Sequence, residues 1–387
     1  MAQKRVVTYT LKNKKEPIKM IHKILILILL SSVVFISCNK NKNNTQEISE
    51  NSFDKKGLLE NYATNIIIPN YNSFSIALDS LILTYNTFKT TESTADFVIV
   101  KQKLHSAYLK YQQINLYEFG PAEQQLVRAN FNIFPTDSVQ IKSNILAGSY
   151  NFQTSDNFDA KGFPALDYLF YDVNKTETQI IQSFVSTINK KKYVSDILTE
   201  MQTKTKTIVD SWNSSYKSQF INSLNTDIGS SIGFLINQLN YELDYLKNAK
   251  IGIPLGKKSL DNPYPTKCEA YYGQQSVQYA IATLAAIESM YLGKSSSGMD
   301  GIGFDDYLDH LKASYGSTSL NTAIKNQFNI VRLKLTNING TLSHQIEVNP
   351  TVVNAAYAEL VKLLVLLKTD LPSHLGVIIT YQDGDGD

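Results

Sequence analysis

Apolar residues recur every three or four positions along most of this chain, which is the spacing of one face of an α-helix. The pattern is clearest in four stretches, at residues 74–88, 232–246, 277–291 and 353–367. Their apolar positions are Phe74, Leu78, Leu81, Tyr85 and Phe88, then Ile232, Leu235, Ile236, Leu239, Leu243 and Leu246, then Val277, Ile281, Leu284, Ile287 and Tyr291, and finally Val353, Ala356, Leu360, Leu363, Leu364 and Leu367. A β-branched run near the C-terminus, residues 377–381, is too short to build a sheet. The sequence therefore predicts an all-α fold of helical bundles.

Clusters of Gly, Pro, Ser and Asn predict where the helices end. They lie at residues 134–137, 154–163, 211–218, 252–265 and 293–303. A chain of this length can bury one or two cores, and two domains are the better expectation. We place the boundary near residue 215. This predicts an N-terminal helical bundle over residues 58–215 and a C-terminal helical bundle over residues 216–387, each with room for about four helices.

The N-terminal residues have the layout of a secretory signal. Two lysines, Lys19 and Lys23, precede an apolar run, and small residues then lead to Cys38. The end of this stretch, Phe35-Ile36-Ser37-Cys38, resembles a bacterial lipobox, in which the thiol is acylated and becomes the first mature residue. A transmembrane anchor is the alternative, but the uncharged residues 24–37 fall short of the roughly 20 that span a bilayer.

We therefore expect residues 1–37 to be a signal peptide with an upstream extension. The polar and basic residues 1–18 sit oddly before such a signal, and either Met1 or Met20 is the start of translation. Residues 38–57 are polar and are expected to form a lipidated, flexible tether. The membrane is then a partner through a lipid on Cys38. The predicted location is the bacterial cell envelope, on the periplasmic or outer-membrane side.

Charge and cysteine content narrow the classes of function. Beyond residue 37 the chain keeps 30 of its 37 basic and 34 of its 35 acidic residues. The net positive charge of the whole chain therefore comes from residues 1–37. Arg128 and Arg332 are the arginines of this part, and its lysines are scattered, so no nucleic acid partner is expected. With Cys38 acylated, Cys268 stands alone, and stability must come from packing, without an intrachain disulfide.

Five short segments depart from ordinary bundle sequence. The first, residues 119–130, combines a Gly-Pro turn with Arg128 in an apolar neighbourhood. Its guanidinium either pairs with a carboxylate as a structural contact or captures an anion with two parallel hydrogen bonds. Sequence leaves both interpretations open.

The second segment, residues 162–170, begins with Gly162 and Pro164, which suits a helix start. Asp167 is then either a carboxylate favoured by the helix dipole or a ligand-binding group.

The remaining three segments are weaker. Residues 250–257 are rich in glycine and proline but lack the spacing of a phosphate loop, so they predict a turn between domains. Residues 268–272 with Ser276 are expected to open an amphipathic helix, in which Glu269 is a cap or a ligand. The terminal residues 383–387 alternate Asp and Gly, but without the rest of a calcium loop they predict a solvated acidic tail.

Motifs for hydrolysis are missing from the sequence. The histidines beyond the leader, His105, His310, His344 and His374, are far apart, and no His-Glu-x-x-His run occurs. Nor does any Gly-x-Ser-x-Gly nucleophile elbow.

Several segments together resemble the imelysin-like family, bacterial envelope proteins associated with iron acquisition and once described as insulin-cleaving peptidases. The resemblance is carried by residues 162–169, 250–256, 269–272 and 375–387, which occur in the family's order. It implies two packed helical bundles with a functional site between them. The family's hallmark is Gly-x-His-x-x-Glu, and the aligned residues here are Gly162, Pro164 and Asp167. Position 164 therefore has no imidazole to bind metal or move a proton.

The resemblance favours a non-catalytic, lipid-anchored envelope protein that holds a small ligand connected with iron uptake. Carboxylates and phenolic oxygens suit ferric iron, so iron or another metal is a candidate cofactor, and iron-uptake proteins are candidate partners. The residues expected at the site are Arg128, Gly162, Pro164, Asp167, Glu269, Tyr272 and Ser276. Two alternatives stay open, a metallopeptidase of the imelysin type and an interaction scaffold with an inactive cleft.

Overall fold

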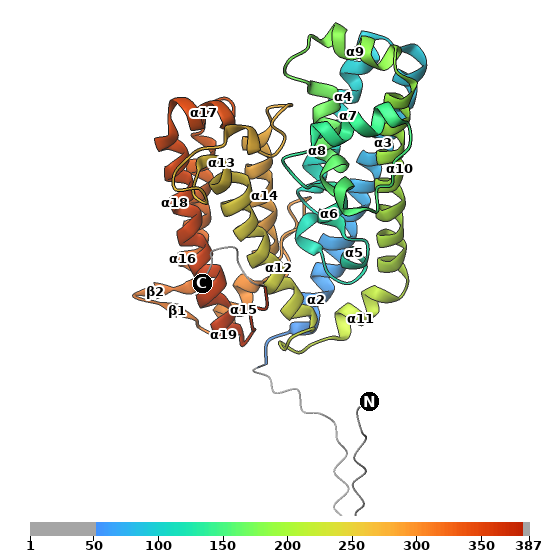
Figure 1. Ribbon diagram of the computed structural model, residues 1–387. Coiled ribbons are helices and arrows are strands. Elements are labelled where there is room, and N and C mark those ends of the chain that lie inside the picture. Colours follow the sequence, from blue (N-terminus) through green and yellow to red (C-terminus); the bar gives the residue numbers. More distant parts are fainter. Residues whose placement is uncertain (1–51, 382–387) are drawn as a thin grey trace, which may run out of the picture. The chain divides into compact units, whose positions relative to one another are not determined.

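The computed structural model describes residues 52–381, and helices make up most of this part of the chain (Figure 1). The predicted all-α fold is confirmed. Over residues 52–381 the strands are β1 (Ser314–Tyr315) and β2 (Thr318–Ser319), which pair antiparallel as one small hairpin. The predicted signal peptide, the lipidation site Cys38 and the acidic tail at 383–387 lie outside the described residues.

The first group of helices comes from residues 55–222. In chain order its elements are α2 (Lys55–Asn61), η1 (Tyr62–Ile67), α3 (Ile68–Thr91), α4 (Thr94–Tyr111), η2 (Asn115–Tyr117), α5 (Pro121–Gln124), α6 (Val127–Phe131), α7 (Ser138–Ala147), η3 (Ser155–Ala160), α8 (Gly162–Tyr171), α9 (Glu177–Val185), α10 (Ile188–Ser211), η4 (Trp212–Tyr216) and α11 (Lys217–Asn222).

The second group comes from residues 231–375. Besides the hairpin, its elements are α12 (Ser231–Tyr245), η5 (Leu246–Gly252), α13 (Ile253–Leu255), η6 (Pro265–Lys267), α14 (Ser276–Tyr291), α15 (Phe304–His310), α16 (Leu320–Thr336), α17 (Leu342–Val348), α18 (Pro350–Val365), η7 (Leu366–Asp370) and α19 (Leu371–Leu375). The two groups belong to one compact unit that begins at Phe53.

The predicted apolar stripes form the cores of both groups. In α3 the five positions from Phe74 to Phe88 are fully buried, and this helix packs against α4 and α10. The stripes of α12 and α18 are buried in the same way, except that Leu364 keeps 7% of its surface exposed. In α14, by contrast, Val277 and Ile281 are only partly buried.

Side-chain caps fix where many helices begin. Ser93, Asp137 and Ser230 each accept a backbone N–H at the start of α4, α7 and α12. Thr176 forms a capping box with Gln179 at the start of α9. Each cap satisfies a donor that the first helical turn leaves free, which typically stabilises a helix by about 1 kcal/mol.

The predicted break at residues 211–218 is wrong. Helices α10, η4 and α11 follow one another without a gap from Ile188 to Asn222. Buried Trp212 contacts the rings of Tyr216 and Phe220, with centroids 4.8 and 5.3 Å away, and this packing outweighs the weak helix propensity of the nearby serines. The next loop lies at residues 223–230, so the domain boundary near 215 stays a prediction.

Two other local predictions need correction. Residues 250–255 do not turn between domains, because η5 and α13 prolong α12 as far as Leu255, and Gly256 ends the helix with φ of +95°. Residues 268–272 do not open a helix either. They form turns, and α14 starts only at Ser276.

The predicted tether ends earlier than residue 57. Helix α2 starts at Lys55, where the Asp54 carboxylate accepts the N–H of Gly57 at 2.8 Å. Phe53 stacks on Tyr307 with ring centroids 4.0 Å apart. This stacking and the Asp54 cap order residues that composition alone assigns to a linker.

Two helical runs in the described residues are long and apolar enough to cross a membrane by length and composition. They are 55–91 and 350–375. Each also supplies fully buried core residues, such as Phe74 in the first and Leu360 in the second. Their apolar character is therefore explained, at least in part, by packing inside the protein.

Candidate functional site

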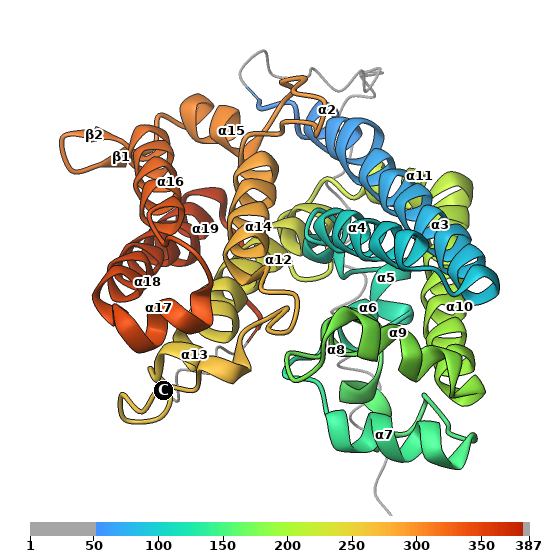
Figure 2. The ribbon, with the colours of Figure 1, turned by 90° about the horizontal axis from the view of Figure 1, so that it is seen from above.

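The two groups meet along one surface, which we call the seam. From the first group it includes the end of α4, η2, α6 and α8, and from the second group α12, η5, the turn at residues 268–274 and α14 (Figure 2). Apolar contacts contribute to it. Tyr108 and Tyr279 have ring centroids 4.4 Å apart, and the rings of Phe119 and Phe234 stack at 5.6 Å.

A buried ion pair lies at the centre of the seam. Glu269 Oε2 is 3.0 Å from Lys250 Nζ, and each side chain is only 1% exposed. Lys250 comes from η5 and Glu269 from the turn before α14. A buried pair of this kind is tolerated only when its remaining donors and acceptors are also satisfied.

Side chains of both groups satisfy that pair. Glu269 Oε1 accepts hydrogen bonds from the Gln112 amide at 3.0 Å and the Asn132 amide at 2.8 Å. Lys250 Nζ donates to Gln112 Oε1 at 2.6 Å and to Thr283 Oγ1 at 2.8 Å. The ion pair of the second group is thus completed by amides of the first, and these five residues form the central part of what we call the seam network.

Arg128 continues the seam network at its other end. Its Nη1 lies 2.7 Å from Glu118 Oε2, and its Nη2 donates to the Asn115 carbonyl and to Gln238 Oε1, both at 2.8 Å. The guanidinium also lies over the ring of Tyr241, 4.1 Å from its centroid. Of the two interpretations of Arg128, the structure shows the carboxylate pair.

Glu242 contacts Arg128 and interacts electrostatically with Lys250 of the central ion pair. This residue is fully buried, its Oε1 accepts the Asn115 amide at 2.8 Å, and its Oε2 is 3.7 Å from Arg128 Nη2. Burial raises the pKa of Glu242 to about 7, although the charges of Lys250 and Arg128 lower it. The carboxyl group of Glu242 therefore ionises less readily than that of an exposed glutamate.

Asp167 bridges the two groups through backbone contacts. Its Oδ2 accepts the N–H of Tyr272 and its Oδ1 that of Gly273, both at 3.0 Å. Asp167 is five positions beyond the first residue of α8, so it does not serve the dipole at the helix start. Burial raises the pKa of Asp167 to about 7. The two hydrogen bonds lower this pKa, and the charge of Glu269 raises it further.

The turn that carries Glu269 is held in a strained conformation. Ala270 and Gln274 have φ of +48° and +58°, a region that side chains other than glycine rarely adopt. The Ser276 hydroxyl donates to the Glu269 carbonyl at 2.5 Å and so closes the turn onto α14. Strained residues of this kind cluster at functional sites, which makes this turn a candidate functional site.

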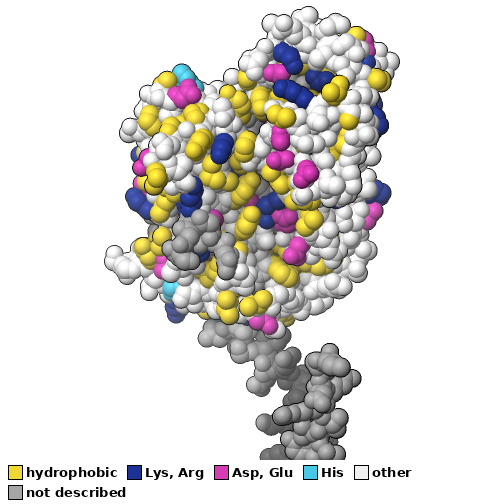
Figure 3. Space-filling model, in the orientation of Figure 1, with side chains coloured by type: hydrophobic (Ala, Val, Ile, Leu, Met, Phe, Trp, Pro, Cys, Tyr) yellow, Lys and Arg dark blue, Asp and Glu magenta, His cyan; other side chains and the backbone are white. Residues whose placement is uncertain are grey.

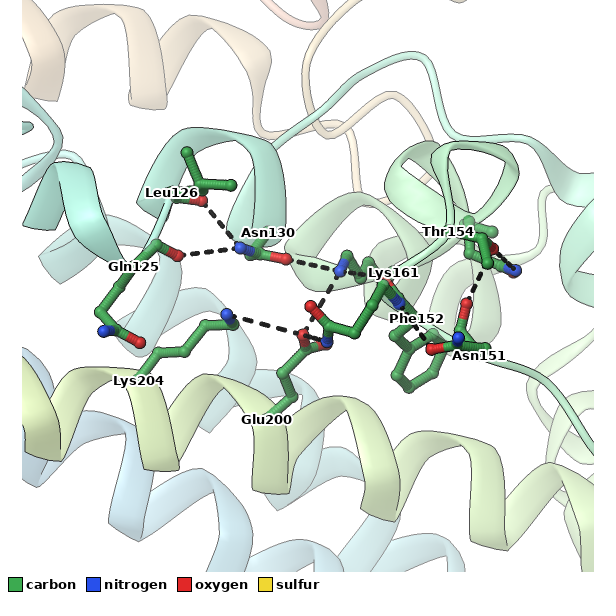
Figure 4. Close-up of polar contacts among 12 residues, drawn as sticks. Gln125, Leu126, Asn130, Asn151, Phe152, Thr154, Lys161, Glu200 and Lys204 are labelled. Atoms are coloured by element: carbon green, nitrogen blue, oxygen red, sulfur yellow. Dashed lines mark hydrogen bonds and ion pairs between the residues drawn. The ribbon is translucent and has the colours of Figure 1, made fainter.

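Lys161 and Gly162 position α8 against the seam. Gly162 has φ of +70°, and a Cβ there would lie 2.3 Å from the Phe131 carbonyl oxygen, so the position requires glycine. Lys161 is 1% exposed and donates at 2.5 Å to Asn130 Oδ1 and to the Phe152 carbonyl (Figure 4). Its Nζ also lies 3.3 Å from Glu200 Oε1 on α10.

A small hollow opens where α8 meets the turn. Pro164 and Asp167 line it from the first group, and Tyr271 and Tyr272 from the second. Its free space is about 20 Å³, close to that of one water molecule. Tyr272 is half-buried at this hollow, where its ring packs edge-on against Tyr168 with centroids 5.0 Å apart.

The residues around the hollow do not fit a bare metal ion. Pro164 has no donor atom, Asp167 already accepts two N–H groups, and Glu269 is paired with Lys250. Across residues 52–381 no group of three or more His, Cys, Asp or Glu side chains is placed to hold a metal ion. His105, the histidine nearest the seam, contacts the Tyr279 hydroxyl at 3.0 Å through Nδ1, and burial lowers its pKa.

The structure therefore brings most of the predicted site residues to the seam, but in two places. Pro164, Asp167 and Tyr272 line the hollow, whereas Arg128 lies in the seam network with Glu118 and Glu242. Sequence analysis missed Lys250, Gln112 and Glu242. For Lys250 a signal existed, since a lysine inside an apolar helical segment needs a buried partner.

Comparisons with known proteins agree with the fold. The family model Peptidase_M75, described as Imelysin, matches residues 67–371. Two similar solved structures are a candidate iron-regulated protein A precursor from Parabacteroides distasonis ATCC 8503 and an imelysin-like protein from Psychrobacter arcticum 273-4.

The first structure has a TM-score of 0.69 at 14% identity and covers 83% of this chain and 95% of its own. The second has a TM-score of 0.65 at 15% identity and covers 84% of this chain and 97% of its own. No curated protein matches the chain. At such low identity these structures establish the fold alone.

Proposed function

Because the chain belongs to the imelysin family, we propose that it is a lipid-anchored envelope protein that binds a small ligand connected with iron uptake and catalyses no reaction. The observation that carries this proposal is the hollow at the seam. There the family's motif position, Pro164 with Asp167, faces the strained turn of Tyr271 and Tyr272. One of the similar structures is named as iron-regulated, which supports the link to iron.

The size and lining of the hollow restrict the ligand. The hollow has space for about one water molecule, so a ligand would rest mainly on the rim that Tyr271 and Tyr272 form. Because the lining does not fit a bare ion, we favour an iron chelate or the organic chelator itself. Aromatic rims with a few polar groups are common at small-molecule sites.

The same geometry argues against the metallopeptidase alternative. That mechanism needs a metal held by three protein ligands with an open position for water. The motif offers a proline in place of the histidine, and the carboxylate of Asp167 is already hydrogen-bonded to the Tyr272 and Gly273 N–H groups.

Calorimetry tests the binding. The full chain is titrated with ferric and ferrous ions, ferric citrate, citrate alone and haem, and saturable binding of at least one chelate or chelator is expected. Tyr272→Ala should weaken that binding about tenfold, because it removes a rim contact worth on the order of 1 kcal/mol. Tyr315→Ala, which changes a 45% exposed tyrosine on β1, serves as the matched control and should have no effect.

Two results would contradict the proposal. Failure of all five ligands to bind would favour the interaction scaffold. Zinc-dependent, chelator-sensitive cleavage of a denatured protein substrate would favour the peptidase. Asp167→Asn is less suitable as a test, because an amide cannot accept both the Tyr272 and Gly273 N–H groups, so it would also destabilise the fold.

A further inference from the structure

A further cavity lies in the first group and is partly open to solvent. It is lined by residues of α7, α8, the 172–176 loop, α9 and the start of α10, and its volume is about 240 Å³. Its lining residues are Ile141, Lys142, Ile145, Leu146, Tyr168, Leu169, Asp172, Lys175, Ser183, Thr187 and Lys190. Basic side chains gather at this end of the molecule, near α7 and α9 (Figure 3). The cavity contains none of the polar groups of the seam network.

Lys190 is the most unusual residue in this cavity. It is only 9% exposed, and its Nζ donates to the Ser183 hydroxyl at 2.7 Å and lies 4.0 Å from the centroid of the Phe184 ring. An ammonium group has three protons to donate. Within the described part of the chain, no carboxylate comes within 4.0 Å of this nitrogen. Buried lysines seldom lack an acidic partner, so this nitrogen is suited to accept an anionic one.

The remaining charged groups of the cavity do not supply that anion. Asp172 faces the cavity, but its Oδ2 pairs with Lys175 at 2.8 Å and its Oδ1 accepts the N–H of Asn174 at 3.1 Å. Lys142 adds a further positive charge at the rim. Three lysines therefore face one aspartate, and the cavity has a surplus of positive charge.

Apolar side chains make up much of the remaining wall. Ile141 is fully buried, and Leu169 is 4% exposed, while Ile145 is partly buried beside them. A ligand that matches this lining has one negative group and an apolar body. A small polyanion such as phosphate would leave the apolar wall without a partner.

We propose that this cavity binds a small monocarboxylic acid, with its carboxylate on Lys190 and its apolar body against Ile141, Ile145 and Leu169. The charge-assisted hydrogen bond would satisfy the buried ammonium, and the aliphatic wall would exclude water from it. Burial, with a contribution from Lys175, lowers the pKa of Lys190 to about 7 although Asp172 raises it, and a bound carboxylate would oppose this decrease. The proposal is independent of any ligand at the seam.

Calorimetry with hexanoate tests the proposal on the full chain. Hexanoate is expected to bind saturably, while hexanol, which has the same number of carbons and no charge, should bind at least about tenfold more weakly. Inorganic phosphate should also bind at least about tenfold more weakly. Equal binding of hexanoate and hexanol, equal binding of phosphate, or no saturable binding of hexanoate would overturn the proposal.

Three variants locate the binding. Lys190→Met removes the charge at similar size and should weaken hexanoate at least about tenfold, with the melting temperature measured to show that the variant folds. Lys142→Met changes an exposed residue at the rim and should weaken the binding of hexanoate about twofold or more. This second variant keeps the test valid if Lys190→Met does not fold. Lys192→Met, an exposed position on α10 outside the cavity, should leave the affinity unchanged. Undiminished hexanoate binding by both Lys190→Met and Lys142→Met would contradict the assignment.

Discussion

Two buried carboxyl groups at the seam, those of Asp167 and Glu242, have pKa values raised to about 7. In the unfolded chain such groups ionise near pH 4. Between these values the folded protein binds more protons than the unfolded chain. The stability they contribute is therefore fully present below about pH 4 and is lost as the pH rises through about 7.

A neutral isostere of Glu242 should remove its part of this dependence. We expect Glu242→Gln to raise the free energy of unfolding at pH 8 by roughly 1–3 kcal/mol relative to the wild type, and to change it little at pH 4. Urea unfolding of both proteins at the two pH values measures the difference. A gain of the same size at both pH values would show that ionisation of Glu242 is not its cause.

Lys190 should show the opposite dependence. Burial lowers its pKa to about 7, so between pH 7 and about 10 the unfolded chain binds a proton that the folded protein does not. The cost of the buried charge is therefore largest below pH 7 and falls as the pH rises. Lys175 and Asp172 face the same cavity, and Lys175 lowers the pKa of Lys190 while Asp172 raises it.

Lys190→Met without any ligand should accordingly stabilise the protein by on the order of 1–4 kcal/mol at pH 6, with a smaller gain at pH 9.5. Thermal unfolding at the two pH values follows the effect, with Lys192→Met as the exposed control on the same helix. A stabilisation that grows with pH would show that the buried charge of Lys190 is not its cause.

At the residue scale, sequence could single out Arg128, Asp167 and Glu269 as unusual, but it could not assign their partners. Arg128 pairs with Glu118 and Glu242, which lie 10 and more than 100 positions away. Helical periodicity says which face of a helix is buried, and not which side chain meets which across a contact. Each of the three residues is therefore explained only by its packed surroundings.

At the scale of elements, α8 is held in place at its start and at its centre. Lys161 and Gly162 fix its start against α6 and α10, and Asp167 fixes its centre to the turn before α14. The backbone at Gly162 approaches the Phe131 carbonyl too closely for any side chain. This helix is therefore a rigid support for the hollow.

Gly162→Ala should destabilise the protein by roughly 2–5 kcal/mol, because a positive φ and a clash with a backbone oxygen both act against it. Gly229→Ala provides the control, since φ there is +88° but no atom lies within 4 Å of the added Cβ. That variant should cost only about 1–2 kcal/mol. Chemical denaturation compares the two, and equal costs would mean that the contact with Phe131 is unimportant.

Elements with strong periodicity, such as α3 and α12, could be predicted from sequence, whereas two continuations could not. Residues 211–218 and 250–255 look like breaks because they contain Ser, or Gly and Pro. The π-helical segments η4 and η5 carry the chain through both, since buried side chains such as Trp212 and Lys250 pack there. Tertiary packing in these places overrides local propensity.

At the scale of the whole molecule, the seam network joins the two groups of helices. The apolar contacts of the seam are accompanied by hydrogen bonds between amides of one group and the buried ion pair of the other. Sequence and resemblance together predicted that unusual polar residues would gather between helical bundles. They did not predict that most of these residues would satisfy one another's hydrogen bonds.

We infer that the seam network is one energetic unit across the two groups of helices. A double-mutant cycle tests it with Gln112→Met in the first group, Lys250→Met in the second and the combined variant, each measured by urea unfolding. Each single change leaves buried polar groups without partners, so the two effects should not add, and we expect a coupling energy above about 1 kcal/mol. The exposed pair Lys206 and Asp210, changed to Met and Asn in a parallel cycle, should couple by less than about 0.5 kcal/mol. If the coupling energy of Gln112 and Lys250 were as small as that of the exposed pair, the seam network would not be one energetic unit.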